Sequence, residues 1–194
     1  MHSFRPLAAV ATLAAGALAT GIGVAVATSG DDRSSKRATA VLVDTSGQHV
    51  GQAVFRERHR AVSVRAYLSG VTPGFHGFHV HAVGACVPPF TSAGGHFNPD
   101  ATAHGDHAGD FPSLLINEDG TGELRFTTDR FTLADLFDAD GSALMVHAGR
   151  DNYANIPDRY HSHATDTLGP DPDTLATGDA GSRSACGEVR RRGH

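Results

Sequence analysis

The sequence has no tryptophan, no internal repeat and no basic stripe, and only two of its 194 residues are cysteine. The 16 Lys and Arg residues and 21 Asp and Glu residues give a formal net charge of −5, and the lack of a basic stripe argues against general nucleic-acid binding. Because neither cysteine is near the N-terminus, lipid attachment there is excluded. Apolar residues make up 40% of the chain and charged residues 19%, which suits a folded core and argues against disorder of the whole chain.

The N-terminal segment has the organisation of an export signal. Arg5 supplies one positive charge, an uncharged run extends from Pro6 to Gly30, and the small residues of Ala25–Ala27 resemble a cleavage site. The run is also long enough to span a bilayer, so an uncleaved anchor is the alternative. We therefore expect residues 1–30 to be a signal peptide or membrane anchor and residues 31–37 to be a polar linker. Either case places the rest of the chain outside the cytoplasm: secreted, periplasmic or anchored to the outer face of the cytoplasmic membrane.

The two cysteines, Cys86 and Cys186, are an even pair. In an oxidising compartment such a pair favours a disulfide. A bridge between positions this far apart would stabilise the fold by up to about 4.7 kcal/mol in the chain-entropy model. Two separate buried thiols are the alternative.

From Ala38 onward the sequence consists of short β-type runs separated by turn residues. The clearest run is Ala61–Leu68, in which apolar residues at even positions alternate with Ser63, Arg65 and Tyr67. This pattern predicts an all-β sandwich or barrel over residues 38–190, with a short tail at 191–194 and a brief helical segment at Thr132–Phe137. The expected strands are Thr39–Asp44, Val50–Arg56, Ala61–Leu68, Phe75–His81, Pro112–Asn117, Gly122–Thr127, Ser142–His147 and Ala185–Val189.

Two long stretches, 82–111 and 148–184, interrupt this rhythm. They are rich in Gly, Pro, Asp and Asn and have no apolar periodicity. Long loops without regular structure in a compact domain are usually functional, so we expect the chemistry of the protein to lie in these two loops.

Many of the 13 histidines gather in or beside the two loops. His79 and His81 are two apart on an expected strand and therefore project from the same face. Neutral imidazoles together with a carboxylate in a Gly-rich loop suit a tetrahedral zinc site. Each histidine alone could be ordinary polar surface, but the whole set favours metal binding. The set comprises His79, His81, His96, His104, His107 and His147, with Asp110.

Five motifs resemble those of copper/zinc superoxide dismutase, in the order in which that family carries them. They are Gly77–His81, Gly95–Pro99, His107–Asp110, Val146–His147 and Gly178–Gly187. The short approach to Cys86 and the long stretch before Arg183 are more similar to the bacterial exported members. The resemblance implies an eight-stranded antiparallel Greek-key β-barrel or sandwich with two long functional loops, an architecture for which this family is itself a known example.

The resemblance also implies a role for each site residue. Asp151 would link His79 to His104 by hydrogen bonds, which fixes the orientation of both rings. Arg183 would hold a small anion beside copper, and His96 would also move a proton. The implied copper ligands are His79, His81, His96 and His147, and the implied zinc ligands are His96, His104, His107 and Asp110.

The implied activity is dismutation of two superoxide anions with two protons to dioxygen and hydrogen peroxide, through Cu(II)/Cu(I) cycling with zinc as a structural partner. A non-catalytic copper-binding or copper-delivery module on the same fold is the alternative. The substrate would be a small molecule, with no nucleic-acid partner and membrane contact only through an uncleaved N-terminal segment. The protein would be a monomer or a homodimer.

Some residues depart from the family pattern or stand outside it. Only two residues separate His104 from His107, so a copper-only protein is an alternative. Glu188 replaces an apolar residue, which predicts an exposed strand end because a buried carboxylate is costly. His76 is expected to bond to backbone rather than metal. His161 and His163 are expected to be plain loop residues, with metal capture as the alternative.

Overall fold

The computed structural model describes residues 36–192. The expected signal peptide or anchor, five of the seven linker residues and the last two residues of the tail lie outside this range. Within the described range, no helix combines the length and the apolar character that crossing a membrane requires.

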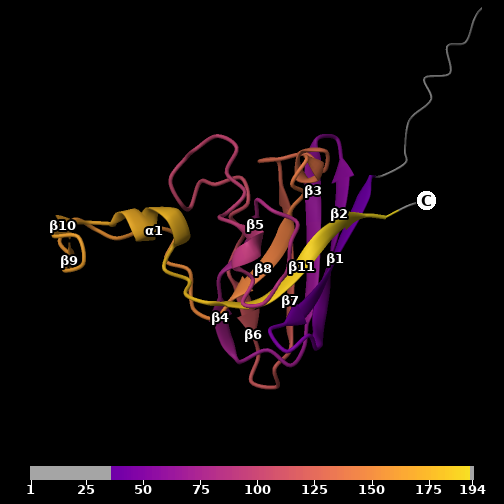
Figure 1. Ribbon diagram of the computed structural model, residues 1–194, viewed down its shortest axis with the longest axis horizontal. Coiled ribbons are helices and arrows are strands. Elements are labelled where there is room, and N and C mark those ends of the chain that lie inside the picture. Colours follow the sequence, from indigo (N-terminus) through magenta and orange to yellow (C-terminus); the bar gives the residue numbers. More distant parts are fainter. Residues whose placement is uncertain (1–35, 193–194) are drawn as a thin grey trace, which may run out of the picture. The chain divides into compact units, whose positions relative to one another are not determined.

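A curled antiparallel sheet of seven strands forms the body of the protein (Figure 1). Its order is β5-β8-β11-β1-β2-β3-β7, so the last strand of the chain lies between β8 and the first strand. The two-stranded ladder of β4 (Gly74–His76) and β6 (Leu114–Ile116) is separate. The seven strands are β1 (Arg37–Asp44), β2 (His49–Arg58), β3 (Ala61–Leu68), β5 (Phe78–His81), β7 (Gly122–Thr128), β8 (Ala143–His147) and β11 (Arg183–Arg191).

The all-β prediction is confirmed, whereas the predicted count of eight strands is not, because the main sheet has seven strands and one expected run is divided. The expected run Phe75–His81 divides at Gly77 into β4 and β5. Gly77 donates its N–H to Gly149 O at 2.8 Å and accepts from His147 N at 2.8 Å. A side chain at this position would meet Ala180, because a Cβ would lie 2.6 Å from the Ala180 Cβ. The break therefore fits β5 closely against the second long loop.

Alternation in β3 creates one wall of the core. Val62, Val64 and Ala66 are fully buried and Leu68 is 4% exposed, while the side chains between them face the other side of the sheet. Phe55 in β2 and Phe126 in β7 belong to the same core, and both are paired with Val64 in register. This packing fixes the frame from which the two long loops extend.

The long loops contain more regular structure than the sequence pattern indicated. The first has one turn of 3-10 helix at Thr91–Ala93. The second carries β9 (His161–Ser162), β10 (Thr167–Leu168) and helix α1 (Pro172–Thr177). The expectation of a stretch without regular structure over 148–184 is thus wrong at these elements. The helical expectation for Thr132–Phe137 is confirmed by a 3-10 turn at Asp135–Phe137.

Helix α1 is short, and its ends explain why it forms. The Asp171 side chain accepts a hydrogen bond from Thr174 N at 3.0 Å, and Pro172 occupies the first turn, where its missing N–H costs nothing. Gly178 ends the helix at a positive φ of 61°, a conformation that glycine adopts readily. These residues at its two ends stabilise the helix, whereas a longer helix would show apolar periodicity.

Candidate metal centre

Four buried histidines converge on one point beside β5. His79 and His81 project from β5, His147 ends β8, and His96 comes from the first long loop. Each offers a ring nitrogen within 4.8 Å of those of the others. All four are 9% exposed or less, so this is an interior group.

Hydrogen bonds to one nitrogen of each ring decide which nitrogen faces the centre of the group. His81 Nδ1 is 3.0 Å from Gly94 O, and His147 Nδ1 is 3.0 Å from Gly181 O. Their Nε2 atoms are left 3.3 Å apart. A ring nitrogen bonded to a carbonyl oxygen must donate, so the opposite nitrogen keeps a free lone pair. Both rings are therefore oriented to bind a metal through Nε2.

His79 is oriented in the opposite sense. Its Nε2 is 2.6 Å from Asp151 Oδ2, and its Nδ1 is buried with no hydrogen-bond partner. An unpartnered polar atom in the interior costs free energy. A metal ion at the centre of the group would satisfy this atom, so the residues present fit such an ion.

The pKa values of these histidines also suit metal binding. Burial lowers the pKa of His79 to about 4, although its hydrogen bond to Asp151 acts in the opposite direction. Burial and the neighbouring His79 lower the pKa of His147 to about 3. Burial and His96 hold the pKa of His81 well below its ordinary value. The rings are thus neutral at neutral pH, which is the form that binds a metal.

A second group adjoins the first and shares His96 with it. Its members are His96, His104, His107 and Asp110, with ligand atoms within 4.8 Å of one another. His96 Nδ1 is 3.0 Å from Asp110 Oδ1 and 3.3 Å from His107 Nδ1, and His107 Nδ1 is 3.4 Å from Asp110 Oδ1. Zinc bonds of about 2.0–2.1 Å require tetrahedral ligand atoms about 3.3 Å apart. These contacts have that spacing.

Asp151 connects the two groups. Its Oδ2 faces His79, while its Oδ1 is 2.8 Å from His104 Nε2 and accepts from Tyr153 N at 2.7 Å. This leaves His104 Nδ1 buried and without a hydrogen-bond partner, 3.3 Å from an oxygen of Asp110. The free nitrogen of His104 therefore points to the second group.

The flanking carboxylates change the protonation of His104. Burial alone would lower its pKa, but Asp110 and Asp151 outweigh burial and raise it to about 9. In return, contacts with His104 and a second histidine hold the pKa of each carboxyl well below its ordinary value, against the effect of burial. His104 thus carries a proton at neutral pH when no metal is bound.

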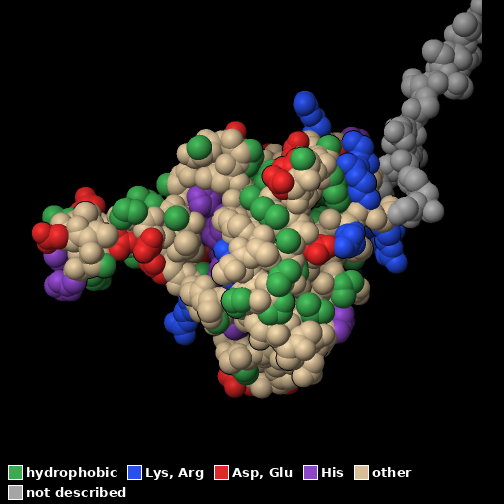
Figure 2. Space-filling view, viewed as in Figure 1, with side chains coloured by type: hydrophobic (Ala, Val, Ile, Leu, Met, Phe, Trp, Pro, Cys, Tyr) green, Lys and Arg blue, Asp and Glu red, His purple; other side chains and the backbone are tan. Residues whose placement is uncertain are grey.

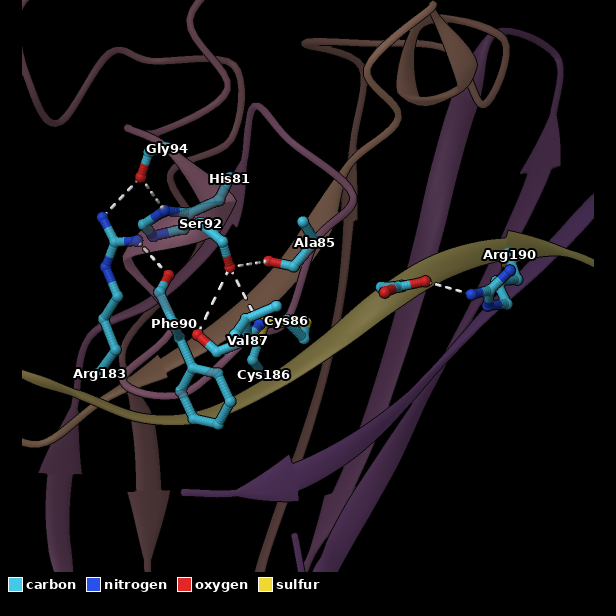
Figure 3. The surroundings of a disulfide bond; sticks show 11 residues. His81, Ala85, Cys86, Val87, Phe90, Ser92, Gly94, Arg183, Cys186 and Arg190 are labelled. Atoms are coloured by element: carbon cyan, nitrogen blue, oxygen red, sulfur yellow. Dashed lines mark hydrogen bonds and ion pairs between the residues drawn. A yellow bond between two sulfur atoms is a disulfide. The ribbon is translucent and has the colours of Figure 1, made fainter. Parts of the chain in front are cut away.

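Arg183 stands at the start of β11, opposite His147 in the β8 ladder. One extra residue, Ser184, forms a bulge before the pairing resumes at Ala185. A bulge redirects the neighbouring side chain, and here the guanidinium donates to Phe90 O and Gly94 O at 2.5 Å each (Figure 3). The Gly94 carbonyl therefore accepts from both Arg183 and His81.

A disulfide joins the first long loop to β11, and the prediction of this bridge is confirmed. Cys86 and Cys186 are bonded (Figure 3). Within the same loop, Ser92 Oγ accepts from Val87 N at 3.0 Å and donates to Ala85 O at 2.9 Å. The bridge thus holds the segment whose carbonyl groups fix Arg183.

A cleft leads from solvent to the first group. Figure 2 shows histidine side chains in the space between the sheet and the segment that carries α1. Arg183 is the only Lys or Arg among the described residues that line the cleft, and Asp173 and Asp179 are its carboxylates. Asp179 is turned aside, since it accepts from Asn152 Nδ2 at 2.6 Å and Thr174 Oγ1 at 2.8 Å. The cleft lining is His81, Gly95, His96, His147, Asp173, Ala176, Thr177, Asp179, Gly181 and Arg183.

The structure brings together every residue that the sequence assigned to the two metal groups, despite the short spacing between His104 and His107. His76 is bonded to backbone as expected, with Nδ1 2.7 Å from His147 O and Nε2 2.8 Å from Thr72 O. Glu188 is partly exposed, as expected, and pairs with Arg190.

Two residues that support the site were not identified from the sequence. Tyr153 stacks on His104 at 6.4 Å between ring centroids and no local pattern singles it out. Gly178 packs directly against the hydrogen bond between Asp151 and His104, because a Cβ there would lie 2.2 Å from both Asp151 Oδ1 and His104 Nε2. Gly178 could have been identified from the sequence because it begins one of the family motifs, Gly178–Gly187.

Comparisons with known proteins agree with these features. The profile described as copper/zinc superoxide dismutase (SODC) matches residues 49–189. The chain is 41% identical over 165 residues to superoxide dismutase (Cu-Zn) of Mycolicibacterium paratuberculosis, covering 78% of this chain and 73% of that relative. It is 31% identical over 165 residues to superoxide dismutase (Cu-Zn) 1 of Salmonella typhimurium, covering 77% of this chain and 82% of that relative. The crystal structure of a double mutant of a SOD-like protein from Bacillus subtilis matches with a TM-score of 0.62 and 29% identity, covering 77% and 95% of the two chains.

Proposed function

The chain belongs to the copper/zinc superoxide dismutase family and is a superoxide dismutase, and we propose that it acts at the cleft formed by His81, His96, His147 and Arg183. The reaction converts two superoxide anions and two protons to dioxygen and hydrogen peroxide. The observation that carries this assignment is the convergence of four imidazoles beside a fixed guanidinium.

We assign the two cofactors to the two interior groups. Copper would be held by His79 Nδ1, by Nε2 of His81 and His147 and by His96, because four imidazoles suit Cu(II). Zinc would be held by Nδ1 of His96, His104 and His107 and by Asp110, whose contacts have tetrahedral spacing. When bound, copper supplies the one-electron redox change, whereas zinc has no redox chemistry and supplies structure.

The protein residues bring the substrate to this point and supply a proton. The Arg183 guanidinium attracts the superoxide anion to the cleft and holds it in place. His96 belongs to both groups and its Nδ1 faces Asp110 and His107, so its Nε2 is the nitrogen that would carry a proton to the product when it is not bound to metal. Asp151 keeps the His79 and His104 rings in a fixed orientation.

The enzyme is favoured over a non-catalytic copper module because no part of the site is missing. A delivery module needs metal ligands, but it does not need a guanidinium at the mouth of the cleft. Here Arg183 is held by two carbonyl groups beside the copper-directed rings. That arrangement binds a small anion next to the metal.

We also propose that the protein works outside the cytoplasm, because a disulfide persists in oxidising compartments. In this proposal residues 1–30 are a signal peptide or membrane anchor, residues 31–37 a linker, residues 38–190 the dismutase domain and residues 191–194 a tail. The anchored and the processed forms differ in membrane association, and the domain acts as a monomer or homodimer.

The decisive experiment combines elemental analysis with a superoxide-decay assay on the same metal-loaded preparation. We expect one copper and one zinc per chain and rapid decay that is lost in the metal-free protein. Copper without turnover would move the assignment to the delivery module. Copper with turnover but without zinc would identify a copper-only enzyme and overturn the assignment of the second group.

A further inference from the structure

Two histidines lie outside the interior groups, on the hairpin formed by β9 and β10. His161 and His163 are two residues apart, and both are exposed to solvent. In Figure 1 this hairpin lies beyond α1, away from the seven-stranded sheet, and Figure 2 shows histidine and acidic side chains together at that end. The proposed mechanism uses neither residue.

We propose that His161 and His163 form a third, solvent-exposed metal site that binds a divalent transition ion of the Cu²⁺ class, with Asp166 as its supporting carboxylate. Imidazole nitrogens bind divalent first-row metals in the order that has Cu²⁺ strongest. The sequence pattern alone favoured plain loop residues at these positions, and the hairpin geometry reverses that preference.

The spacing of the two rings is that of histidines in the interior groups. The ring centroids of His161 and His163 are 5.1 Å apart. The corresponding distance is 5.3 Å for His104 and His107 in the second group and 5.5 Å for His81 and His147 in the first. Two imidazoles at this distance can share one ion after small rotations, which exposed side chains make freely.

Asp166 prepares one of the rings for binding. Its Oδ1 is 2.8 Å from His161 Nε2, so the Nδ1 of that ring keeps its lone pair. A carboxylate on the far nitrogen of a ligating histidine is a common support in metal sites, and Asp151 supports His79 in the same way. Asp166 reaches back because it has a positive φ of 55° in the loop between the strands.

The hairpin is held in place and its surroundings are acidic. Ser162 Oγ donates to Asp171 Oδ2 at 2.7 Å, which ties the hairpin to the residue that caps α1. Gly169 N donates to Tyr160 O at 2.9 Å. Residues 158–173 contain four Asp and a single Arg, a local charge that favours a cation.

The test is a Cu²⁺ titration of the holoenzyme, with both interior groups already loaded, by equilibrium dialysis and atomic absorption. We expect the wild-type protein to bind one further Cu²⁺ per chain. The His161→Ala/His163→Ala variant loses this ion, and Asp166→Asn weakens its binding roughly 10-fold. Interior copper, interior zinc and the rate of superoxide decay stay at wild-type values in all three proteins.

The matched control is His49→Ala/His59→Ala, which removes two other exposed histidines and keeps the further ion. The proposal is wrong if the wild-type holoenzyme takes up no further copper or if the hairpin variant retains it. Equal loss in the control variant would show non-specific binding to surface histidines and would also overturn it. Because interior metal content and activity are measured separately, this outcome is distinguishable from a failure of the dismutase assignment.

Discussion

A single carboxylate, that of Asp151, orients one ligand of each proposed metal. It accepts from His79 on one oxygen and from His104 on the other. Both contacts are fully buried at the side chains, so a lost acceptor cannot be replaced by water without a change in packing. The side chain of this one residue would thus affect both metals without contacting either.

Replacing this carboxylate by an amide tests its role. In Asp151→Asn the amide NH2 replaces one carboxylate oxygen and faces a histidine N–H, so one of the two hydrogen bonds is lost. We therefore expect the affinity for both metals to fall by about 10- to 100-fold. Competition with chelators of known affinity measures the change. Asp106→Asn, in the first long loop and exposed at the side chain by 80%, is the control, and equal affinities in the two variants would contradict the bridging role.

Substitutions at Arg183 can separate the effect of the positive charge of its side chain from that of the planar shape of the guanidinium. Removing the charge in Arg183→Ala should lower kcat/KM by about 10-fold or more and weaken its dependence on ionic strength, since local charge steers anionic substrates. Arg183→Lys keeps the charge but not the planar fork that bonds two carbonyl groups, so we expect an intermediate value. Stopped-flow measurements at several salt concentrations, with copper content held equal, decide between these outcomes. Unchanged rates in Arg183→Ala would remove the steering role.

At the scale of elements, the sequence predicted the strands well where they bury alternate side chains, as β3 does. Ala61–Leu68 is found at its predicted boundaries, and the run before His81 is divided only where Gly77 packs on Ala180. The short elements β9, β10 and α1 bury few apolar residues, so no periodicity marks them. They depend on caps and turns, as at Asp171, whose effect is visible only in the folded chain.

The metal-directed residues could also be predicted, whereas their orientation could not. Histidine spacing and the family motifs identified every member of the two interior groups. The oxygens that choose the ligating nitrogen of His81 and His147 belong to the backbone of Gly94 and Gly181. Every residue has a carbonyl group, so the sequence does not show which ones accept these hydrogen bonds. Their positions depend on the path of the two long loops.

The disulfide joins the first long loop to β11. Opening the Cys86–Cys186 bridge should lower the free energy of unfolding by up to about 4.7 kcal/mol, because it closes a separation of 100 residues. It should also lower kcat/KM, because Phe90 and Gly94 then hold Arg183 less firmly. Urea unfolding and superoxide decay, compared between the oxidised protein and Cys86→Ser/Cys186→Ser, measure both effects. A variant that is less stable but fully active would show that the loop keeps its position without the bridge.

At the scale of the whole molecule, metal binding and folding are coupled through protons. The two long loops meet at His104, whose pKa of about 9 in the metal-free chain lies above the ordinary value of 6.5. A pKa raised by folding stabilises the folded state below the unfolded value, and this contribution disappears as pH rises through about 9. The metal-free protein should therefore lose stability from this group between about pH 6.5 and pH 9.

The same proton competes with zinc. Because zinc binds the deprotonated ring, its apparent affinity should rise by up to about tenfold per pH unit between pH 7 and pH 9 and then level off. Isothermal titration calorimetry in buffers of different ionisation enthalpy measures the proton released. His104→Ala should remove this release and weaken zinc, while a wild-type affinity that does not vary with pH would contradict the assignment of His104.

The bulge at Ser184 limits which insertions and deletions this protein can tolerate during evolution. The separation between the guanidinium and the copper-directed ring is set by hydrogen-bond pairing of β11 with β8, in which Arg183 stands opposite His147. Loss of that one extra residue would shift the cation to the reverse side of the strand. Insertions and deletions should therefore be absent from the segment between Arg183 and Cys186, whose length stays constant among active descendants, and should accumulate at the chain ends instead.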